Sequence, residues 1–290
     1  MKIRLFILLA TLPFFCGTIQ AQTDIPLDES AMYFDKNELP DATVWLPAPP
    51  DTMTTQFVYD ITQYMWGKQQ RLDTDRLEMA ISHVVKDPKR MAALFSEPFG
   101  MTISEEETPA IYKLVHMSVP TLRLTATFPK AEYSRKRPYV RFNETTPYPD
   151  DEEIERNAGS YPSGHTVRGW GLALLLAEVN PENQNAILKL GYEWGQSRVI
   201  LGYHWQSDVD ASRMLAAACV ATLHSNTEFL ADLAAAKEEY ARLTGQSTGV
   251  NVITHPASVT SNRTYQINGT PADENTKGIV IQGNQKKLVR

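Results

Sequence analysis

The chain has 290 residues, of which 42% are apolar, enough for one large domain or two small ones with a sizeable buried core. Its formal net charge of −6 argues against nucleic acid and anionic membranes as partners. A site for an anion must therefore be a local cluster of basic side chains in an acidic protein.

The first 21 residues have the pattern of a secretory signal peptide. Residues 1–4 carry two basic side chains, residues 5–15 are mainly apolar, and small and polar residues lead to Ala21, after which we expect cleavage. The apolar run is too short to span a bilayer comfortably, and no later run reaches about 18 apolar residues. We therefore expect a periplasmic or secreted protein without an integral membrane segment. Cys219 is then the one remaining cysteine, which excludes an intrachain disulfide.

Residues 22–50 are proline-rich and predict an irregular arm laid over the domain. Apolar residues at helical spacing then predict helices, whereas strand signals are nearly absent. Ser104 and Glu107 have the spacing of a capping box that starts one helix, and Pro120 separates that helix from the next. The pattern predicts a single all-α helical bundle over residues 51–245. In the N-terminal part of this range, the predicted helices cover about 51–70, 74–85, 89–95, 104–117 and 122–135.

Basic residues gather at the end of the last of these helices. Lys130 is followed after six residues by Arg137 and Pro138. We assign the neighbouring Arg135, Lys136 and Arg141 to ordinary surface charge, and His83, in the second helix, to a surface or partly buried position without chemistry.

Residues 143–158 are polar, acidic and rich in turn-forming residues, and they predict a surface loop. Four consecutive carboxylates at 150–153 could suggest a metal site. Consecutive carboxylates more often form a solvated run, and no histidine or alternating ligand spacing supports a metal here. We therefore predict no bound metal.

The segment Gly159–Thr166, with the sequence GSYPSGHT, is the central feature of the chain. Ser163 can cap the apolar helix that follows, which we expect to end near Val179. The N–H groups at a helix N-terminus form an anion site, and His165 can exchange a proton near neutral pH.

The next predicted helix starts at Asn180, with Pro181 in its first position, and reaches Ser197 and Arg198. After a break at Gly202, a further helix is expected to begin near His204. Asp208 is four residues later, so the two side chains would share one helix face and the carboxylate could accept Nδ1–H of His204. A last amphipathic helix is predicted to end at Gly245.

Together, the patterns K-x6-RP, PSGH and SR-x5-H-x3-D resemble the three-part signature of the type 2 phosphatidic acid phosphatase (PAP2) superfamily. The longer strings GSYPSGHT and SRVILGYHWQSDVDASR resemble the bacterial class A non-specific acid phosphatases in particular. The resemblance runs from about Leu46 to about Leu243.

The resemblance implies a helical bundle of the PAP2 and haloperoxidase type and a secreted acid phosphatase acting on small phosphate monoesters. It implies that His204, oriented by Asp208, attacks phosphorus to form a phosphohistidine, and that His165 is the acid for the leaving alcohol. It further implies no metal or cofactor, broad specificity, an acidic pH optimum, a phosphotransferase side activity and a homodimer. The implied phosphate-binding residues are Lys130, Arg137, Ser163, Gly164 and Arg198.

Three alternatives remain open. A vanadium haloperoxidase has a similar anion pocket, and a halide-dependent peroxidase assay with vanadate would reveal it. A lipid-phosphate phosphatase is disfavoured by the lack of membrane spans. A secreted binding or structural protein that has lost catalysis is disfavoured by the complete set of motif residues, and a p-nitrophenyl phosphate assay would decide.

From residue 246 the composition shifts to Ser, Thr, Asn and Gly, with short β-like pieces. The pieces around Tyr265–Pro271, Lys277–Ile281 and Lys286–Val289 resemble the C-terminal sorting domain of the type IX secretion system. That resemblance implies transport across the outer membrane or to the cell surface; the alternative is a disordered polar tail.

Overall fold

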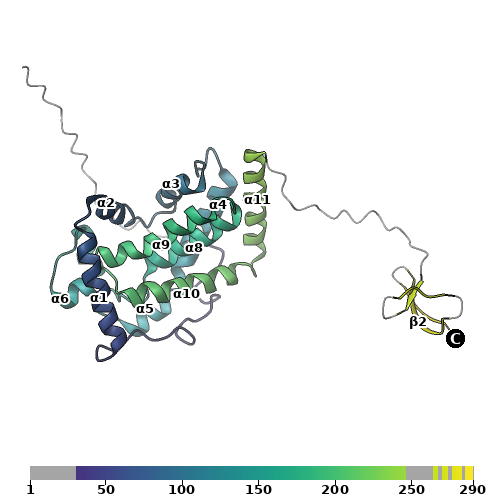
Figure 1. The fold of residues 1–290 in the computed structure, drawn as a ribbon, viewed down its shortest axis with the longest axis horizontal. Helices are drawn as coiled ribbons and strands as arrows, with labels where there is room; N and C mark the ends of the chain where they lie inside the picture. Colours follow the sequence, from purple (N-terminus) through teal and green to yellow (C-terminus); the bar gives the residue numbers. More distant parts are fainter. Residues whose placement is uncertain (1–30, 246–263, 267–269, 274–275, 283–284, 290) are drawn as a thin grey trace, which may run out of the picture. The chain divides into compact units, whose positions relative to one another are not determined.

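The computed structural model describes residues 31–245, 264–266, 270–273, 276–282 and 285–289 (Figure 1). The chain divides into two compact units, the first ending at Tyr240 and the second beginning at Ala241. The expected signal peptide and the first part of the expected arm lie outside the described residues.

The described part of the first unit is helical, as the sequence predicts. The helix α11 (Thr227–Thr244) begins in this unit and crosses its boundary. The preceding elements are α1 (Thr55–Gln70), α2 (Thr74–Ser82), α3 (Pro88–Phe99), α4 (Pro109–Leu124), α5 (Thr127–Tyr133), α6 (Pro138–Phe142), η1 (Pro149–Asp151), α7 (Glu152–Glu155), α8 (Gly164–Val179), α9 (Gln184–Ile200) and α10 (Gln206–Leu223).

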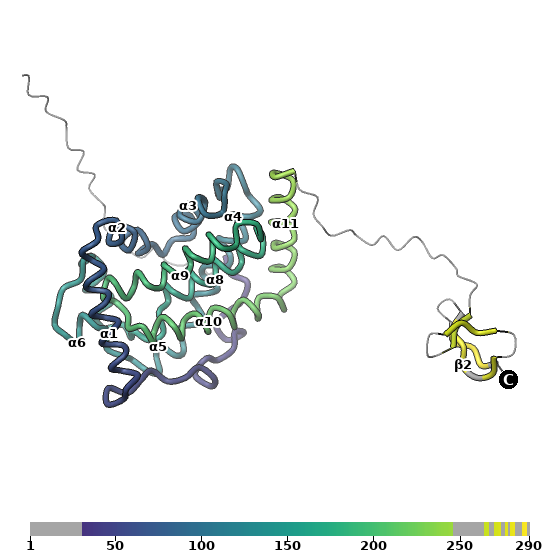
Figure 2. Tube along the Cα trace, in the orientation of Figure 1, coloured from purple at the N-terminus to yellow at the C-terminus, as the bar shows by residue number. Residues whose placement is uncertain are grey.

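The central helix is α8, which packs against α9, α10 and α4 (Figure 2). It is buried on nearly all sides, as expected for a helix that is apolar around its whole circumference. Its crossing with α9 is close: a Cβ at Gly169 would lie 2.4 Å from Cγ of Trp194. This close packing holds the start of α8, which carries the PSGH segment, against the end of α9, which carries Arg198.

The capping-box prediction at Ser104 is wrong. Ser104 Oγ accepts the N–H of Glu107 in a turn, and α4 starts later, at Pro109. Pro120 does not end this helix, although it removes one helical hydrogen bond. Pro120 and its neighbours on α4 are buried in the bundle, so we attribute the continuous helix to packing that outweighs the loss.

The four carboxylates at 150–153, expected to form a solvated run, are only partly solvated: Asp150 and Glu153 are exposed, whereas Asp151 and Glu152 are buried. Residues 149–155 form η1 and α7. Asp151 lies 3.4 Å from Nζ of Lys86, and the Glu152 carboxylate accepts the backbone N–H of Thr146. Burial is tolerated because each carboxylate has a partner.

The segment 31–50 lies on the bundle with several apolar residues buried. Its carbonyl at Pro47 accepts a hydrogen bond from the Tyr161 hydroxyl, which belongs to the central turn. The buried residues of the segment are Ala31, Tyr33, Leu39, Ala42 and Leu46.

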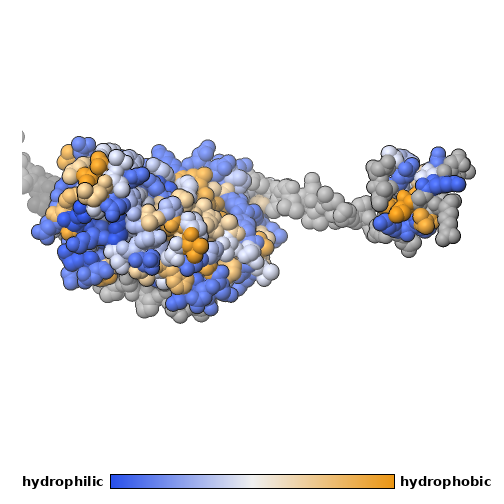
Figure 3. All heavy atoms as spheres, turned by 90° about the horizontal axis from the view of Figure 1, so that it is seen from below, coloured by the Kyte–Doolittle hydropathy of each residue, from blue (hydrophilic) through white to orange (hydrophobic). Residues whose placement is uncertain are grey.

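The face seen in Figure 3 is mainly polar, with scattered apolar groups. In the part of the chain that the structure describes, no helix is both long and apolar enough to cross a membrane.

The second unit contains a three-stranded antiparallel sheet in the order β1-β2-β3. Tyr265 pairs with Ile281, which pairs in turn with Lys286. The strands are β1 (Thr264–Gln266), β2 (Gly278–Gln282) and β3 (Gln285–Val289).

Candidate active site

The PSGH turn starts α8. Ser163 is its N-cap, and its Oγ accepts hydrogen bonds from the Thr166 backbone N–H at 3.3 Å and from the Thr166 hydroxyl at 2.9 Å. Gly164 is the first helical residue, where N–H groups have no partner within a helix. A Cβ at Gly164 would lie 3.9 Å from Cε of Lys130, so the two motifs meet here.

Two contacts hold this turn on α10. The backbone N–H of Ser163 donates to Ser212 Oγ at 2.7 Å, and Ser160 Oγ donates to the Asp208 carboxylate. The PSGH motif and the H-x3-D motif are therefore joined directly.

Arg137 is buried, and its guanidinium is fully engaged. Its ion-pair partner is the carboxylate of Glu155, on α7. Nη1 lies 3.1 Å from Nε2 of His204, which joins the first motif to the third. The remaining acceptors are the carbonyl oxygens of Glu155 at 2.9 Å, Ala158 at 3.1 Å, Tyr203 at 3.1 Å and Gly159 at 3.5 Å.

Lys130 and Arg198 complete the cationic cluster. Lys130 Nζ donates to the Gly159 carbonyl at 2.7 Å. Arg198 is fully buried, with its guanidinium carbon 4.7 Å from the ring centroid of Tyr203. Among the described residues, none accepts a hydrogen bond from its guanidinium. A buried charge without hydrogen-bond acceptors is costly, and an anion bound there would reduce the cost.

His204 does not lie on a helix with Asp208, contrary to our expectation. It precedes Trp205, the N-cap of α10, whereas Asp208 is in the first turn and accepts the Trp205 N–H at 2.8 Å. The two side chains still meet, with Nδ1 of His204 3.4 Å from Oδ2 of Asp208. The loop after Gly202, whose φ is +84°, brings them together.

His165, the second residue of α8, is also buried. Its Nε2 lies 3.1 Å from the Val84 carbonyl. Because a carbonyl only accepts, Nε2 must carry the proton of this hydrogen bond. In the neutral ring, Nδ1 is then the unprotonated nitrogen.

Burial and the neighbouring cations favour neutral imidazoles. Burial, followed by the charge of Arg137, lowers the pKa of His204 to about 3. Burial, followed by the charge of Arg198, lowers the pKa of His165 well below its usual value. Burial and Arg137 lower the pKa of Lys130 to about 7. A bound phosphate would oppose all three shifts, because negative charge favours protonated groups.

Arg135 is not the surface charge that we expected. Its side chain is 9% exposed, with Nη1 2.6 Å from Oδ1 of Asp208 and Nη2 2.7 Å from Oδ2 of Asp60. Burial alone would raise the pKa of Asp208, but its contacts with His204 and Arg135 bring it well below the usual value. No sequence signal marked this network, because Asp60 is far away in the chain, on α1.

His83 was expected at the surface or partly buried, but it is buried. Its Nδ1 lies 2.9 Å from Ser197 Oγ, and its ring stacks on Trp194 with centroids 4.7 Å apart. It thus supports the residue that precedes Arg198. These contacts explain why the ring is buried.

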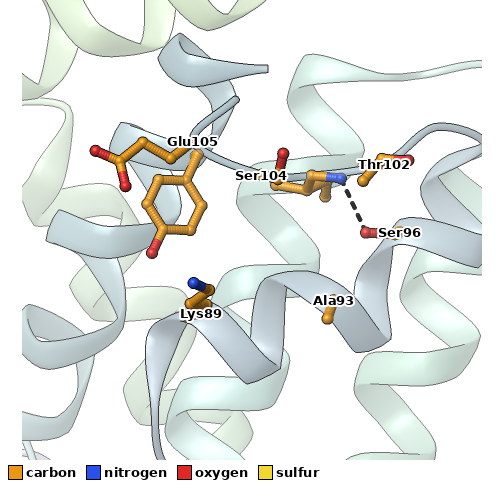
Figure 4. Close-up of a pocket in the computed structure, with 8 residues that line it drawn as sticks. Lys89, Ala93, Ser96, Thr102, Ser104 and Glu105 are labelled. Carbon is orange, nitrogen blue, oxygen red and sulfur yellow. Dashed lines mark hydrogen bonds between the residues drawn. The ribbon is translucent and has the colours of Figure 1, made fainter. Parts of the chain in front are cut away.

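A pocket between α3 and the turn at 102–105 contains none of the predicted site residues (Figure 4). In the described ranges, no group of three His, Cys, Asp or Glu is placed to hold a metal ion.

The sequence profile of the PAP2 superfamily matches residues 114–230, which include all three motifs. A non-specific acid phosphatase of Providencia stuartii is 43% identical over 78% of this chain and 92% of its own length. A non-specific acid phosphatase of Salmonella typhimurium is 38% identical over 67% and 78%, and an acid phosphatase of Zymomonas mobilis is 28% identical over 77% and 82%, respectively. With a matching profile, a helical fold and this level of identity, the chain belongs to the PAP2 superfamily and, within it, to the bacterial class A non-specific acid phosphatases.

Proposed function

We propose that this phosphatase hydrolyses small phosphate monoesters through a phosphohistidine on His204, without a metal ion. The observation that carries the proposal is the buried guanidinium of Arg198, for which no described residue provides a hydrogen-bond acceptor. Phosphate oxygens are suitable acceptors for its fork of N–H groups.

Phosphate binding would use five residues from the three motifs. Arg198, Arg137 and Lys130 supply positive charge, while Ser163 Oγ and the Gly164 N–H add donors at the start of α8. These contacts strengthen as negative charge develops on the transferring phosphoryl group. The cations take the part that a metal ion plays in other phosphatases.

His204 is the proposed nucleophile. Its pKa is lowered to about 3 in the free protein, mainly by burial, which favours the neutral ring with its lone pair at mildly acidic pH. Nδ1 faces Asp208, which leaves Nε2 to attack phosphorus. Asp208 stabilises the positive charge that the ring gains when the N–P bond forms. The bond from phosphorus to the alcohol oxygen breaks in the same step.

His165 is the proposed general acid. The Val84 carbonyl holds its Nε2–H, so a second proton on Nδ1 is the one available to the leaving alcohol. The phosphate charge raises the pKa of this ring towards the acidic working range. Activity is therefore expected to fall as pH rises above neutral. In the second step, His165 accepts a proton from the water that attacks the phosphohistidine, and an alcohol in place of water gives phosphotransfer.

The proposal extends to location and assembly, as the sequence and the family suggest. We propose that residues 1–21 direct export, that residues 51–245 form the catalytic domain, and that the protein works as a homodimer. The end of the chain is proposed to act as a type IX sorting segment, and the sheet β1–β3 is compatible with a small folded tail. Size-exclusion chromatography of the mature protein tests the dimer, and a fusion of residues 246–290 to a reporter tests sorting.

The mechanism is tested with His204→Asn and p-nitrophenyl phosphate. We expect a loss of several orders of magnitude in kcat and no alkali-stable phosphoenzyme after rapid quenching, because the nucleophile is gone. The exposed His224→Asn is the matched control and should behave as wild type. A phosphoenzyme that persists in His204→Asn would contradict the proposal, as would loss of wild-type activity with a chelator.

A further inference from the structure

Arg137, one of the proposed phosphate-binding residues, is already paired with a carboxylate of its own chain. Its guanidinium nitrogen Nη2 is paired with the Glu155 carboxylate, and its other N–H groups contact backbone carbonyls and His204. A guanidinium has five N–H donors, so it has none to spare for phosphate in this arrangement.

Phosphate binding must therefore displace an acceptor from Arg137. The carbonyl acceptors are backbone groups, three in the segment from the end of α7 to the turn before α8 and one, that of Tyr203, in the loop before α10. The two movable acceptors are His204 Nε2, which must leave Arg137 to attack phosphorus, and the Glu155 carboxylate. Glu155 is thus in direct competition with the substrate for the same guanidinium.

The charges around Glu155 support this competition. Its carboxylate lies 3.4 Å from Nζ of Lys86, which also contacts Asp151. Burial acts to raise the pKa of Glu155, but the surrounding cations lower it far below its usual value, so the group is anionic. The cations responsible are Arg137, Lys86, Lys130 and Arg198.

We propose that Glu155 is an internal competitor for the phosphate site: it occupies Arg137 in the free enzyme, is displaced when phosphate binds, and promotes product release by returning. This inference rests on the proposed function. A carboxylate left beside a phosphate dianion would be repelled by it, which weakens the binding of substrate phosphate and product phosphate alike. The side chain is 16% exposed and sits at the end of the four-residue helix α7, so a short movement reaches solvent.

The test is Glu155→Gln, which keeps the shape but removes the charge. An amide can donate to a phosphate oxygen, so inorganic phosphate should inhibit the variant at about tenfold lower concentration, with KM also lower. The value of kcat should fall, because product leaves more slowly. If Glu155 only braced Arg137, removing its charge would loosen that residue, and phosphate inhibition would weaken or stay unchanged. Either result would overturn the proposal.

Two controls make the outcome specific. Glu153→Gln removes the same charge from an exposed position on α7 and should leave phosphate inhibition unchanged. Arg198→Gln should abolish phosphate inhibition. If phosphate inhibits Arg198→Gln as strongly as wild type, the proposed site itself is wrong. If Arg198→Gln behaves as expected but Glu155→Gln matches wild type, only the competition fails.

A structure of the wild-type protein with vanadate gives a second measurement that needs no folded variant. The proposal expects vanadate on Arg137 and the Arg137–Glu155 ion pair broken. An intact ion pair with vanadate bound to Arg137 would refute it.

Discussion

Arg135 and Arg198 are two arginines in the interior of the same bundle, and their surroundings differ. Arg135 bridges two buried carboxylates, Asp60 and Asp208. Arg198 is more deeply buried and has no hydrogen-bond acceptor among the described residues. The first is satisfied by the chain itself, as structural charges are. Arg198 contacts the Tyr203 ring and is stabilised by the negative charges of Glu155 and Asp151, but these groups accept no hydrogen bond from it, which is consistent with the proposed phosphate site.

The same substitution at both positions tests this comparison. Arg198→Met should reduce kcat/KM by roughly 10²–10³-fold, because a proposed major donor to the phosphoryl oxygens is lost. Its thermal stability should be equal to wild type or higher, since a buried charge without acceptors is removed. Steady-state kinetics measure kcat/KM, and thermal unfolding at low phosphate concentration measures the stability. A variant that is active but unstable would reverse the assignment of Arg198.

Arg135→Met should behave in the opposite way. It leaves the Asp60 and Asp208 carboxylates buried without their cation, so we expect the free energy of unfolding to fall by about 3–5 kcal/mol. Urea denaturation measures the loss. Adding Asp60→Asn should recover part of it, because one of the two unpaired charges is then gone. If Arg135→Met is as stable as Arg198→Met, the distinction between the two arginines fails.

The surroundings of Arg198 can also be tested through the pH dependence of stability, at His83, which contacts the residue before Arg198. Burial and the charges of Arg76 and Arg198 lower its pKa to about 4. The unfolded chain binds the proton more readily between about pH 6.5 and pH 4, so the folded state loses stability as pH falls through this range. His83→Phe retains a ring against Trp194 and removes this contribution.

We therefore expect the stability difference between pH 7 and pH 5 to be about 1–2 kcal/mol smaller in His83→Phe than in wild type. Urea denaturation at the two pH values provides the measurement. An unchanged difference would mean that His83 titrates normally in the folded protein.

Local sequence patterns were enough to predict the helical class and the eight candidate site residues. The spacing of residues within a short motif is a property of the sequence and does not depend on long-range packing. PSGH and SR-x5-H-x3-D could therefore be recognised without coordinates. The cap at Ser163 was also predictable, because capping depends on neighbours in sequence.

Tertiary structure decided what could not be seen locally. Arg135 was expected to be a surface charge, but Asp60 of α1 pairs with it in the fold; Glu155 was expected to lie in a surface loop, but it pairs with the buried Arg137. His204 and Asp208 meet through a loop and a helix cap rather than along one helix face. In each case the electrostatic environment of a charged group depends on residues far away in the chain, and only folding brings them together.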